Sequence, residues 1–294
     1  MDNKRLLVIG LVWPEPNSSA AGTRMIQLIN VFLANGFEVF FASASNKSDF
    51  SYNLPSLGVR ELEIKLNDPS FDTAIKQLSP EVVMFDRFAT EEQYGWRVQE
   101  ACPDALTILD TEDLHFLRRH RQDQVKADKD PQLFNDVAKR EIAAILRTDI
   151  SLIISEYEMQ LLNKQFRIDP SILCYLPFME DIPDQKTVAA WKTFEEREGF
   201  TFIGNFLHEP NWHAVQLLKT KIWPNISRTT AAGMHIYGAY ASPKVMQLHN
   251  PRERFYVHDD QIGPFSRLGF THDGRLETAW PNGTDWVSAG HNAT

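Results

Sequence analysis

Two segments of the chain begin the same strand–loop–helix plan, one at Leu6 and the other at Phe200. In the first, an apolar run is followed by a loop of small residues and a helical pattern from about Thr23. In the second, a run typical of a buried strand ends in a tight turn, and Pro210 then opens a helix with apolar residues at helical spacing. This repetition predicts two α/β domains of the kind that bind nucleotides.

The N-terminal part alternates strand and helix signals, which predicts βαβ units and a parallel sheet. The apolar run from Leu6 is continuous, as expected for a parallel strand covered on both faces. The helix after it is expected to end at Asn35-Gly36, a favourable C-terminal cap. The other strand-like runs of this part are 39–42, 82–85, 105–109, 150–154 and 172–176, and the stretch 133–146 is amphipathic and helical.

The domain organisation follows from where these patterns stop. We predict an N-terminal domain over residues 1–182, a linker over 183–198, a partial second domain over 199–260 and a degenerate tail over 261–294. The linker prediction rests on a polar, charged composition with few strand formers. The tail has little apolar periodicity, so it is not expected to complete a sheet.

Composition narrows the function classes. The chain of 294 residues is 43% hydrophobic and 23% charged, which is ordinary for a globular protein of two domains. Its formal net charge of -9 argues against general affinity for nucleic acid, because phosphate binding needs a basic surface. No signal peptide or membrane-spanning run is recognisable, and Cys102 and Cys174 follow no metal or redox spacing. We therefore expect a cytoplasmic protein whose cysteines are reduced and buried.

Ligands of open α/β sheets bind beyond the carboxyl ends of the strands, and three strand ends contain candidate site residues. The first is the loop 13–22, whose small residues, Gly22 among them, would let backbone N–H groups face an anion at the following helix. This loop lacks the G-x-G-x-x-G pattern and a Walker lysine, so neither a dinucleotide fold nor a P-loop is indicated. An ordinary surface loop is the competing interpretation.

The second strand end is the segment 110–118, in which Asp113 and His115 enter a helix. Histidine is the usual acid–base group near neutral pH, which makes this segment a candidate catalytic site. The competing interpretation is that Asp113 or Thr111 caps the helix and that His115 is a satisfied interior residue.

The third strand end is the Gly204-Asn205 turn together with Asn211. Glycine permits close backbone approach, and the following helix offers N–H groups to a phosphate. A simple turn with Asn211 as the helix N-cap is the alternative.

No metal site is expected. His208 and His213 resemble a zinc-binding helix, but their spacing is one residue too long and Pro210 breaks the turn. The acid-x-acid sequence Asp128-Lys129-Asp130 lies in a run of charges before a proline, as a solvated loop would.

Together these segments resemble a known family. The runs 202–206, 210–212 and 235–238 resemble the donor domain of bacterial family-4 glycosyltransferases of GT-B type, and 110–118 resembles part of the acceptor domain in one branch of that family. The resemblance covers most of residues 5–258. It implies two Rossmann-like domains facing across a cleft, with a nucleotide-diphosphate sugar bound mainly to the second and the acceptor mainly to the first. It also implies transfer with retention of anomeric configuration, with no metal or other cofactor besides the donor.

The resemblance assigns roles to the candidate residues. It places the donor diphosphate at the Gly204 turn, where Asn205 and Asn211 are the neighbouring donor-binding candidates. The loop of Gly22 would border the reacting sugar and the acceptor. His115, in the segment 110–118, is a candidate catalytic residue near the cleft, and so is its neighbour Asp113. Helix N-termini can stabilise the departing diphosphate without a metal.

The tail departs from the family pattern. The family has a lysine that contacts phosphate and a glutamate that binds the nucleotide ribose, and those positions fall here at Asp273 and Thr278, with Glu277 one place away. An intervening helix and strand and the closing helices have no counterpart. A truncated or frameshifted donor domain would give this sequence, and Glu277 is its candidate ribose ligand.

The sequence leaves three alternative functions for this chain. The leading one is a glycosyltransferase-like protein that uses a nucleotide sugar and an unknown saccharide or lipid-linked acceptor, with no nucleic-acid partner and with peripheral membrane contact left open. A non-catalytic remnant or binding module is the alternative that the irregular tail indicates. A Rossmann oxidoreductase is disfavoured, because the glycine fingerprint is missing from residues 10–22.

Overall fold

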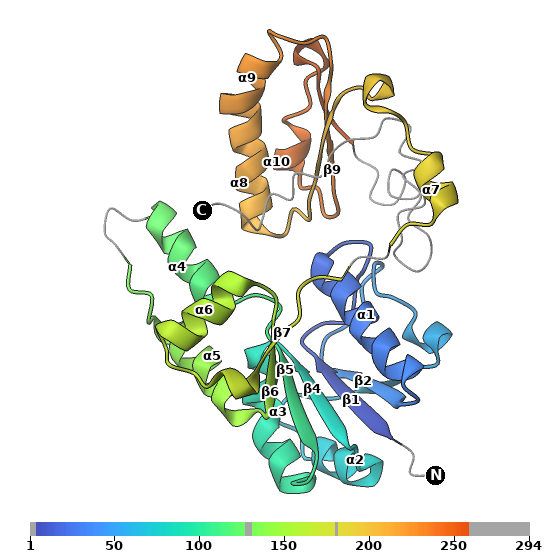
Figure 1. Cartoon of the computed structure of the whole chain (residues 1–294), viewed down its shortest axis with the longest axis vertical. Helices are drawn as coiled ribbons and strands as arrows, with labels where there is room; N and C mark the ends of the chain where they lie inside the picture. The colour runs from blue at the N-terminus through green and yellow to red at the C-terminus, as the bar shows by residue number, and fades with distance from the viewer. Residues whose placement is uncertain (1–3, 127–130, 180–181, 259–294) are drawn as a thin grey trace. The chain divides into compact units, whose positions relative to one another are not determined.

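The computed structural model describes residues 4–126, 131–179 and 182–258. The chain divides into two compact units. Of the described residues, the first unit comprises 4–14, 24–126 and 131–179, and the second comprises 15–23 and 182–258. Each unit contains a parallel β-sheet with helices packed on it (Figure 1).

The first unit is built around a seven-stranded sheet in the order β3-β2-β1-β4-β5-β6-β7, with every neighbouring pair parallel. The sheet grows in one direction from β1 to β3 and in the other from β4 to β7, as doubly wound folds do. The strands are β1 (Arg5–Gly10), β2 (Glu38–Ser43), β3 (Arg60–Glu63), β4 (Val82–Asp86), β5 (Leu106–Asp110), β6 (Ile150–Ile153) and β7 (Leu173–Tyr175).

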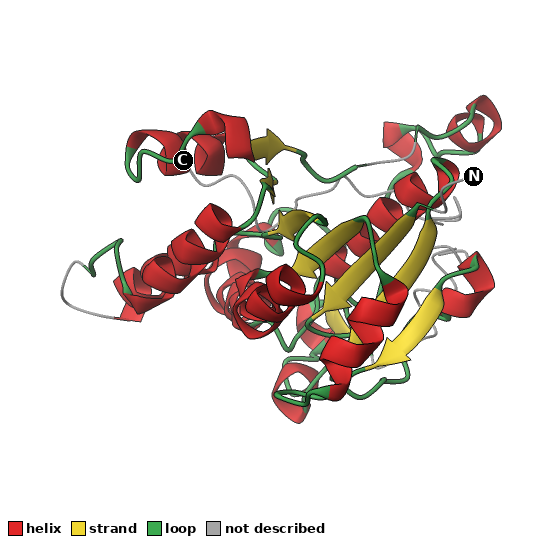
Figure 2. Cartoon of the chain, turned by 90° about the horizontal axis from the view of Figure 1, so that it is seen from below, coloured by secondary structure: helices red, strands yellow, loops and turns green. Residues whose placement is uncertain are grey.

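Helices cover both faces of this sheet (Figure 2). The helical elements are α1 (Ala20–Ala34), η1 (Leu54–Leu57), α2 (Ser70–Leu78), α3 (Phe88–Ala101), α4 (His115–Lys126), α5 (Asp136–Arg147), α6 (Glu156–Lys164) and η2 (Pro170–Ile172). In β1, Leu7 and Ile9 belong to the core that α3 and α5 cover, while Leu6 and Val8 belong to the core that α1 covers. Burial on both faces explains why this strand is a continuous apolar run.

The second unit has a parallel sheet in the order β10-β9-β8 over its described residues. Its elements are α7 (Gln185–Ala189), η3 (Phe194–Glu196), β8 (Phe200–Ile203), α8 (Glu209–Leu217), the π-helical turn η4 (Leu218–Ile222), α9 (Trp223–Ile226), β9 (Met234–Tyr237), α10 (Pro243–Met246), η5 (Pro251–Glu253) and β10 (Phe255–Val257). Val215 and Trp223 pack with Ile236 in its core. His235 and His258 stack in a separate group of rings, with His235 Nδ1 3.0 Å from His258 Nε2.

Most predicted strands and helices are confirmed, with shifted ends. Helix α1 begins at Ala20 rather than near Thr23, and the Glu15 carbonyl accepts the N–H of Ser19 just before it. Gly36, with φ of 81°, follows the end of the helix as predicted. The sequence did not predict β3, because its residues Arg-Glu-Leu-Glu are polar, as suits an edge strand.

Two burial predictions are wrong. The strand at Phe200 was expected to be buried, but β8 lies at an edge of the described sheet and its side chains are exposed or half-exposed. The cysteines were also expected to be buried. Cys102 is half-buried, with Sγ 3.6 Å from the carbonyl of Ile75, and Cys174 is exposed on the edge strand β7.

Candidate functional site

Polar residues collect at the carboxyl ends of β4 and β5, and β4 lies between β5 and β1 in the first sheet. Strand β4 ends at Asp86, whose Oδ2 accepts the backbone N–H of Leu11 (3.1 Å) just beyond β1. Strand β5 ends at Asp110, which is paired in register with Asp86 and fully buried. Ligands of doubly wound sheets bind at this edge.

Arg24 of α1 is the charge partner of Asp110. Its Nε lies 3.1 and 3.3 Å from the two carboxylate oxygens, and its Nη2 lies 3.1 Å from Oδ1. Arg24 Nη1 also donates to the carbonyl of Pro177 (3.1 Å). Burial raises the pKa of Asp110 to about 6, while the Arg24 charge acts in the opposite direction. The carboxylate is therefore ionised at neutral pH.

Two non-glycine residues with left-handed backbone follow these strands. Arg87 has φ of 71° and Glu112 has φ of 64°, a region that few residues with a side chain adopt. The N–H of Arg87 donates to the carbonyl of Asp110 (2.8 Å), which fixes the end of β4 against β5. Strain of this kind concentrates at active sites and ligand clamps.

The carboxyl of Glu112 is protonated at neutral pH. Burial, followed by the charges of Asp110 and Asp86, raises the pKa of Glu112 to about 8, and Arg87 opposes this. Its Oε1 is buried and has no hydrogen-bond partner among the described residues. A neutral carboxyl near the ionised Asp110 is the arrangement that acid–base sites use to hold different protonation states at one pH.

His115 is the first residue of α4 and lies beside Asp113. Its Nε2 is 3.6 Å from Asp113 Oδ1 and makes no hydrogen bond with the described residues. The ring packs edge-on against Phe88, with centroids 5.4 Å apart. Burial, followed by the Arg118 charge, lowers the pKa of His115 to about 4, and Asp113 opposes this. The imidazole is therefore neutral at pH 7 and can exchange a hydrogen bond with a substrate hydroxyl.

The N-terminus of α4 is capped by glutamate side chains from other helices. Glu141 of α5 accepts the N–H groups of the first two residues of α4 (3.1 and 2.9 Å), and Glu158 of α6 accepts that of Leu114 (3.1 Å). These N–H groups already have acceptors, so the interpretation of Asp113 or Thr111 as the cap of this helix is wrong. Asp113 is left beside the imidazole instead.

In the second unit, the predicted turn joins β8 to α8. The N–H of Gly204 donates to the carbonyl of Tyr237 (3.1 Å) at the end of β9. Asn211 Nδ2 donates to the carbonyl of Asn205 (3.0 Å) and so closes the turn. Asn211 lies in the first turn of α8, and His208 occupies the N-cap position, so the predicted cap at Asn211 is wrong.

The loop before α1 belongs to the same unit as this turn. Asn205 Nδ2 donates to the carbonyl of Ser18 (3.1 Å), and the Tyr240 hydroxyl donates to the Glu15 carboxylate (3.0 Å). Gly22 lies in the first turn of α1 rather than in the loop. A Cβ at Gly22 would lie 2.4 Å from the backbone carbon of Glu15, so only glycine allows the loop to fold back.

The structure brings the predicted site residues together in two groups. His115 and Asp113 lie together in the first unit. The Gly204 turn and the loop before α1 lie together in the second, and Gly22 follows that loop in the first turn of α1. Glu277 and the acidic sequence 128–130 both lie outside the described residues. The proposed roles of these residues stay predictions.

Sequence reasoning missed Asp86, Arg87 and Arg24. A signal for the first two was present, because the run 82–85 ends at an acidic residue as the run before Asp110 does. Arg24 gives no such signal, since its partner is 86 positions away in the sequence.

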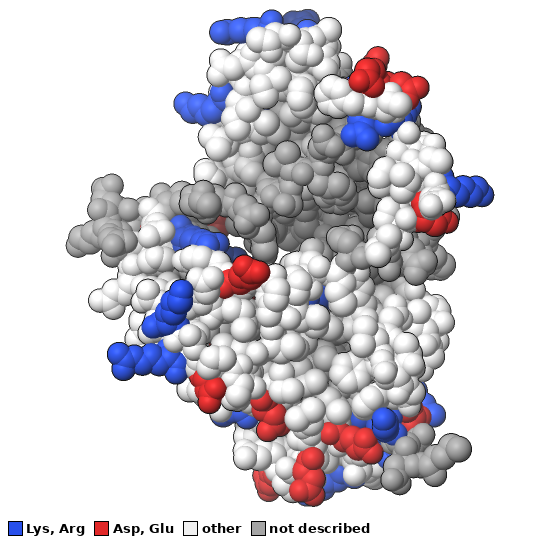
Figure 3. All heavy atoms as spheres, viewed as in Figure 1, with Lys and Arg blue, Asp and Glu red and all other residues white. Residues whose placement is uncertain are grey.

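The described surface shows mixed charge. On the face in Figure 3, Lys and Arg side chains stand among Asp and Glu side chains along the lower part of the view. No helix in the described part of the chain is long and apolar enough to cross a bilayer. Within residues 4–126, 131–179 and 182–258, no group of three or more His, Cys, Asp or Glu side chains is placed to hold a metal ion.

No protein-family model matches the chain, and no curated protein does. Solved structures do match it. The apo form of the lipopolysaccharide outer core galactosyltransferase WaaB is 14% identical with a TM-score of 0.55, covering 90% of this chain and 70% of that one. Sucrose-phosphate synthase from Thermosynechococcus elongatus is 14% identical with a TM-score of 0.58, covering 87% and 70%. A glycosyltransferase from Rickettsia africae is 11% identical with a TM-score of 0.54, covering 89% and 70%.

The fold is of the GT-B type. It consists of two α/β units of Rossmann type, and the described part of the second is partial, with a three-stranded sheet. At this level of identity the likeness establishes architecture rather than substrate. The neighbours favour neither the oxidoreductase alternative nor the binding-module alternative.

Proposed function

We propose that this chain transfers a sugar from a nucleotide-diphosphate sugar to a saccharide or lipid-linked acceptor, with retention of anomeric configuration and without a bound metal. The observation that carries the proposal is the edge of the first sheet, where a neutral imidazole with an unpartnered nitrogen lies beside a carboxylate. Its place at the carboxyl ends of the strands of a GT-B fold supports a role in binding the acceptor. The solved neighbours support sugar transfer at a general level.

In the first unit, the imidazole of His115, which is 20% exposed, is proposed to hold the acceptor hydroxyl. The low pKa of His115, about 4, keeps the ring neutral at pH 7, so its unprotonated nitrogen can accept the hydroxyl hydrogen bond. Asp113, 3.6 Å from Nε2, would stabilise positive charge that develops on the ring. Both residues therefore act on the hydroxyl that attacks the sugar.

In the second unit, the Gly204 turn is proposed to hold the donor diphosphate. Helix α8 begins just after it, and a helix N-terminus attracts anions. The glycine lets phosphate oxygens approach the backbone, while Asn205 and Asn211 fix the turn. The loop before α1, together with Gly22 in the first turn of that helix, is proposed to border the reacting sugar and the acceptor, and Glu277 is proposed to bind the nucleotide ribose.

The test separates donor binding from transfer. The purified chain is incubated with UDP-, GDP-, ADP- and dTDP-sugars, and release of the nucleoside diphosphate is measured with and without EDTA. We expect at least one donor to react, at a rate that EDTA does not change. In His115→Ala the rate with that donor should be about 100-fold lower. Glu100→Gln, at an exposed position of α3, is the matched control and should keep the wild-type rate.

Calorimetry with the same donors gives the second readout. His115→Ala should bind the donor as the wild type does, because the donor residues lie in the other unit. Absence of binding by every donor would refute the Gly204 assignment. Wild-type transfer by His115→Ala would refute the role of the imidazole.

The acceptor class is part of this proposal. A lipid-linked acceptor would bring the chain into peripheral contact with a membrane surface, whereas a soluble saccharide would not. The net charge of -9 disfavours nucleic acid as the acceptor. Co-sedimentation with vesicles that contain a polyprenyl-phosphate sugar, against plain vesicles, separates the two acceptor types.

A further inference from the structure

A groove of about 560 Å³ lies between α3 and α5 of the first unit. One end of its lining includes Thr107 and Asp149, at the starts of β5 and β6. Starts of parallel strands lie at the sheet edge opposite their carboxyl ends, and the lining contains neither His115 nor Asp113. The groove is therefore separate from the candidate active site.

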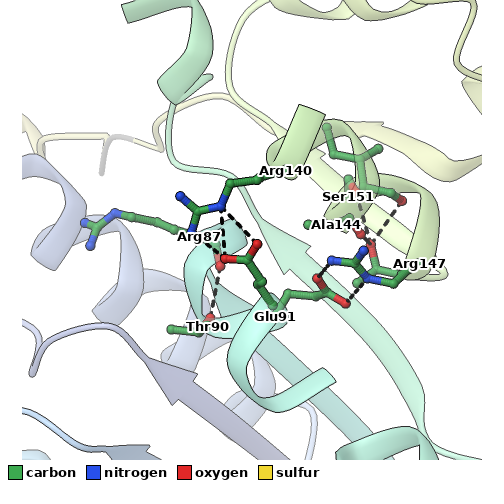
Figure 4. Close-up of polar contacts among 10 residues, drawn as sticks. Arg87, Thr90, Glu91, Arg140, Ala144, Arg147 and Ser151 are labelled. Atoms are coloured by element: carbon green, nitrogen blue, oxygen red, sulfur yellow. Dashed lines mark hydrogen bonds and ion pairs between the residues drawn. The ribbon is translucent and has the colours of Figure 1, made fainter. Parts of the chain in front are cut away.

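Ion pairs fix the two walls of this groove. Arg147 of α5 donates to Glu91 of α3 through Nε (2.8 Å) and Nη2 (Figure 4). Arg140 donates to Glu92 through Nε (2.9 Å). Gly95 lies on the α3 wall, and a Cβ there would lie 2.5 Å from Glu91 Oε1. Because Gly95 has no side chain, there is room for the Glu91 carboxylate beside it, and no side chain of residue 95 projects into the groove.

The lining has no formal net charge. Its charged side chains are three acids and three bases, namely Glu91, Glu92, Asp149, Lys139, Arg140 and Arg147. Lys139 is further paired with Asp136 (2.8 Å). Charge complementarity would therefore give an anion or a cation little advantage here, and a neutral polar ligand fits better.

An exposed indole forms part of the groove wall. The Trp96 side chain is 55% exposed and belongs to the lining. The guanidinium of Arg97 lies 4.5 Å from its ring centroid and is itself tied to Asp72 by two hydrogen bonds of 2.8 and 2.7 Å. Gln99 follows on the same helix and also lines the groove. The indole is therefore held in place while much of it stays open to a ligand.

We propose that this groove binds a neutral saccharide chain. The C–H face of a hexose packs on an aromatic ring, and its hydroxyls both donate and accept hydrogen bonds. Trp96 supplies the ring, while Gln99, Glu92 and Arg140 supply planar donors and acceptors beside it. A volume of about 560 Å³ lies within the usual range for small-ligand sites. The inference is independent of the proposed transfer activity, because no residue of that site lines the groove.

The test uses calorimetry of the full chain with three neutral probes, maltohexaose, cellohexaose and mannohexaose, and with an acidic probe, hexagalacturonic acid. We expect at least one neutral probe to bind, and Trp96→Ala to bind it about tenfold more weakly. Gln99→Ala should weaken it as well. Trp191→Ala removes another half-exposed tryptophan, outside the groove, and should bind like the wild type.

Three outcomes would overturn the proposal. They are failure of all three neutral probes to bind, equal binding by Trp96→Ala, and tighter binding of the acidic probe. Circular dichroism and the unfolding midpoint of Trp96→Ala should match the wild type, which excludes a folding defect. If Trp96→Ala is unstable, the exposed Gln99→Ala variant decides the question.

Discussion

Glu112 makes the folded chain less stable as the pH rises, and replacing it with glutamine should remove the part of the pH dependence that this side chain contributes. The pKa of Glu112 is raised from 4.5 to about 8 in the folded state, first by burial. Between these two values the folded state keeps a proton that the unfolded state has released. The stabilising contribution is therefore complete below pH 4.5 and is lost as the pH rises toward 8, the reverse of an ion-paired carboxylate.

The size of the effect follows from the shift. One pKa unit corresponds to about 1.36 kcal/mol, so the wild type should lose up to about 3 kcal/mol of unfolding free energy through this group between pH 4.5 and about pH 7. Glutamine has nearly the same volume and no charge. Glu112→Gln should therefore match the wild type near pH 4.5 and exceed it by up to about 3 kcal/mol near pH 7.

Urea unfolding at several pH values, followed by tryptophan fluorescence, measures the difference. The midpoint should change with pH in the wild type more than in Glu112→Gln, while the denaturant slope stays the same. In Glu100→Gln, a change at an exposed position, the urea midpoint should change with pH as it does in the wild type. The reasoning would be refuted if the difference in unfolding free energy between Glu112→Gln and the wild type did not change with pH. It would also be refuted if the wild type were the more stable of the two at neutral pH.

Three further predictions concern the other parts of the two candidate sites. Asp113→Asn should lower kcat for sugar transfer and leave the calorimetric affinity for the donor unchanged, and equal losses of both would contradict its assignment to the first unit's site. Gly238→Ala would place a Cβ 1.8 Å from the carbonyl oxygen of Gly204, so it should abolish donor binding, and normal donor affinity would refute the placement of this turn. Arg24→Met leaves Asp110 buried without its partner and should cost about 3–5 kcal/mol of unfolding free energy in urea at neutral pH. The double variant with Asp110→Asn should recover part of that loss.

Much of the architecture could be predicted from local sequence pattern. The continuous apolar run in β1 required a strand covered on both faces, and Asn35-Gly36 required the end of the first helix. Ligands of α/β sheets bind at the carboxyl ends of strands, so Asp113 and His115 could be placed in a candidate site before any contact was known. Each of these features can be predicted from residues close together in the sequence and from the regular spacing of side chains in a strand or a helix.

Tertiary structure alone decided the chemistry of that site. The pairing of Arg24 with Asp110 and the capping of α4 by Glu141 join residues far apart in the chain. The neutral states of Glu112 and His115 depend on how much water the fold removes from them and on which charges it brings near. Sequence fixes which groups can ionise, but burial and distance set the free energy of ionisation, and both exist only in the folded chain.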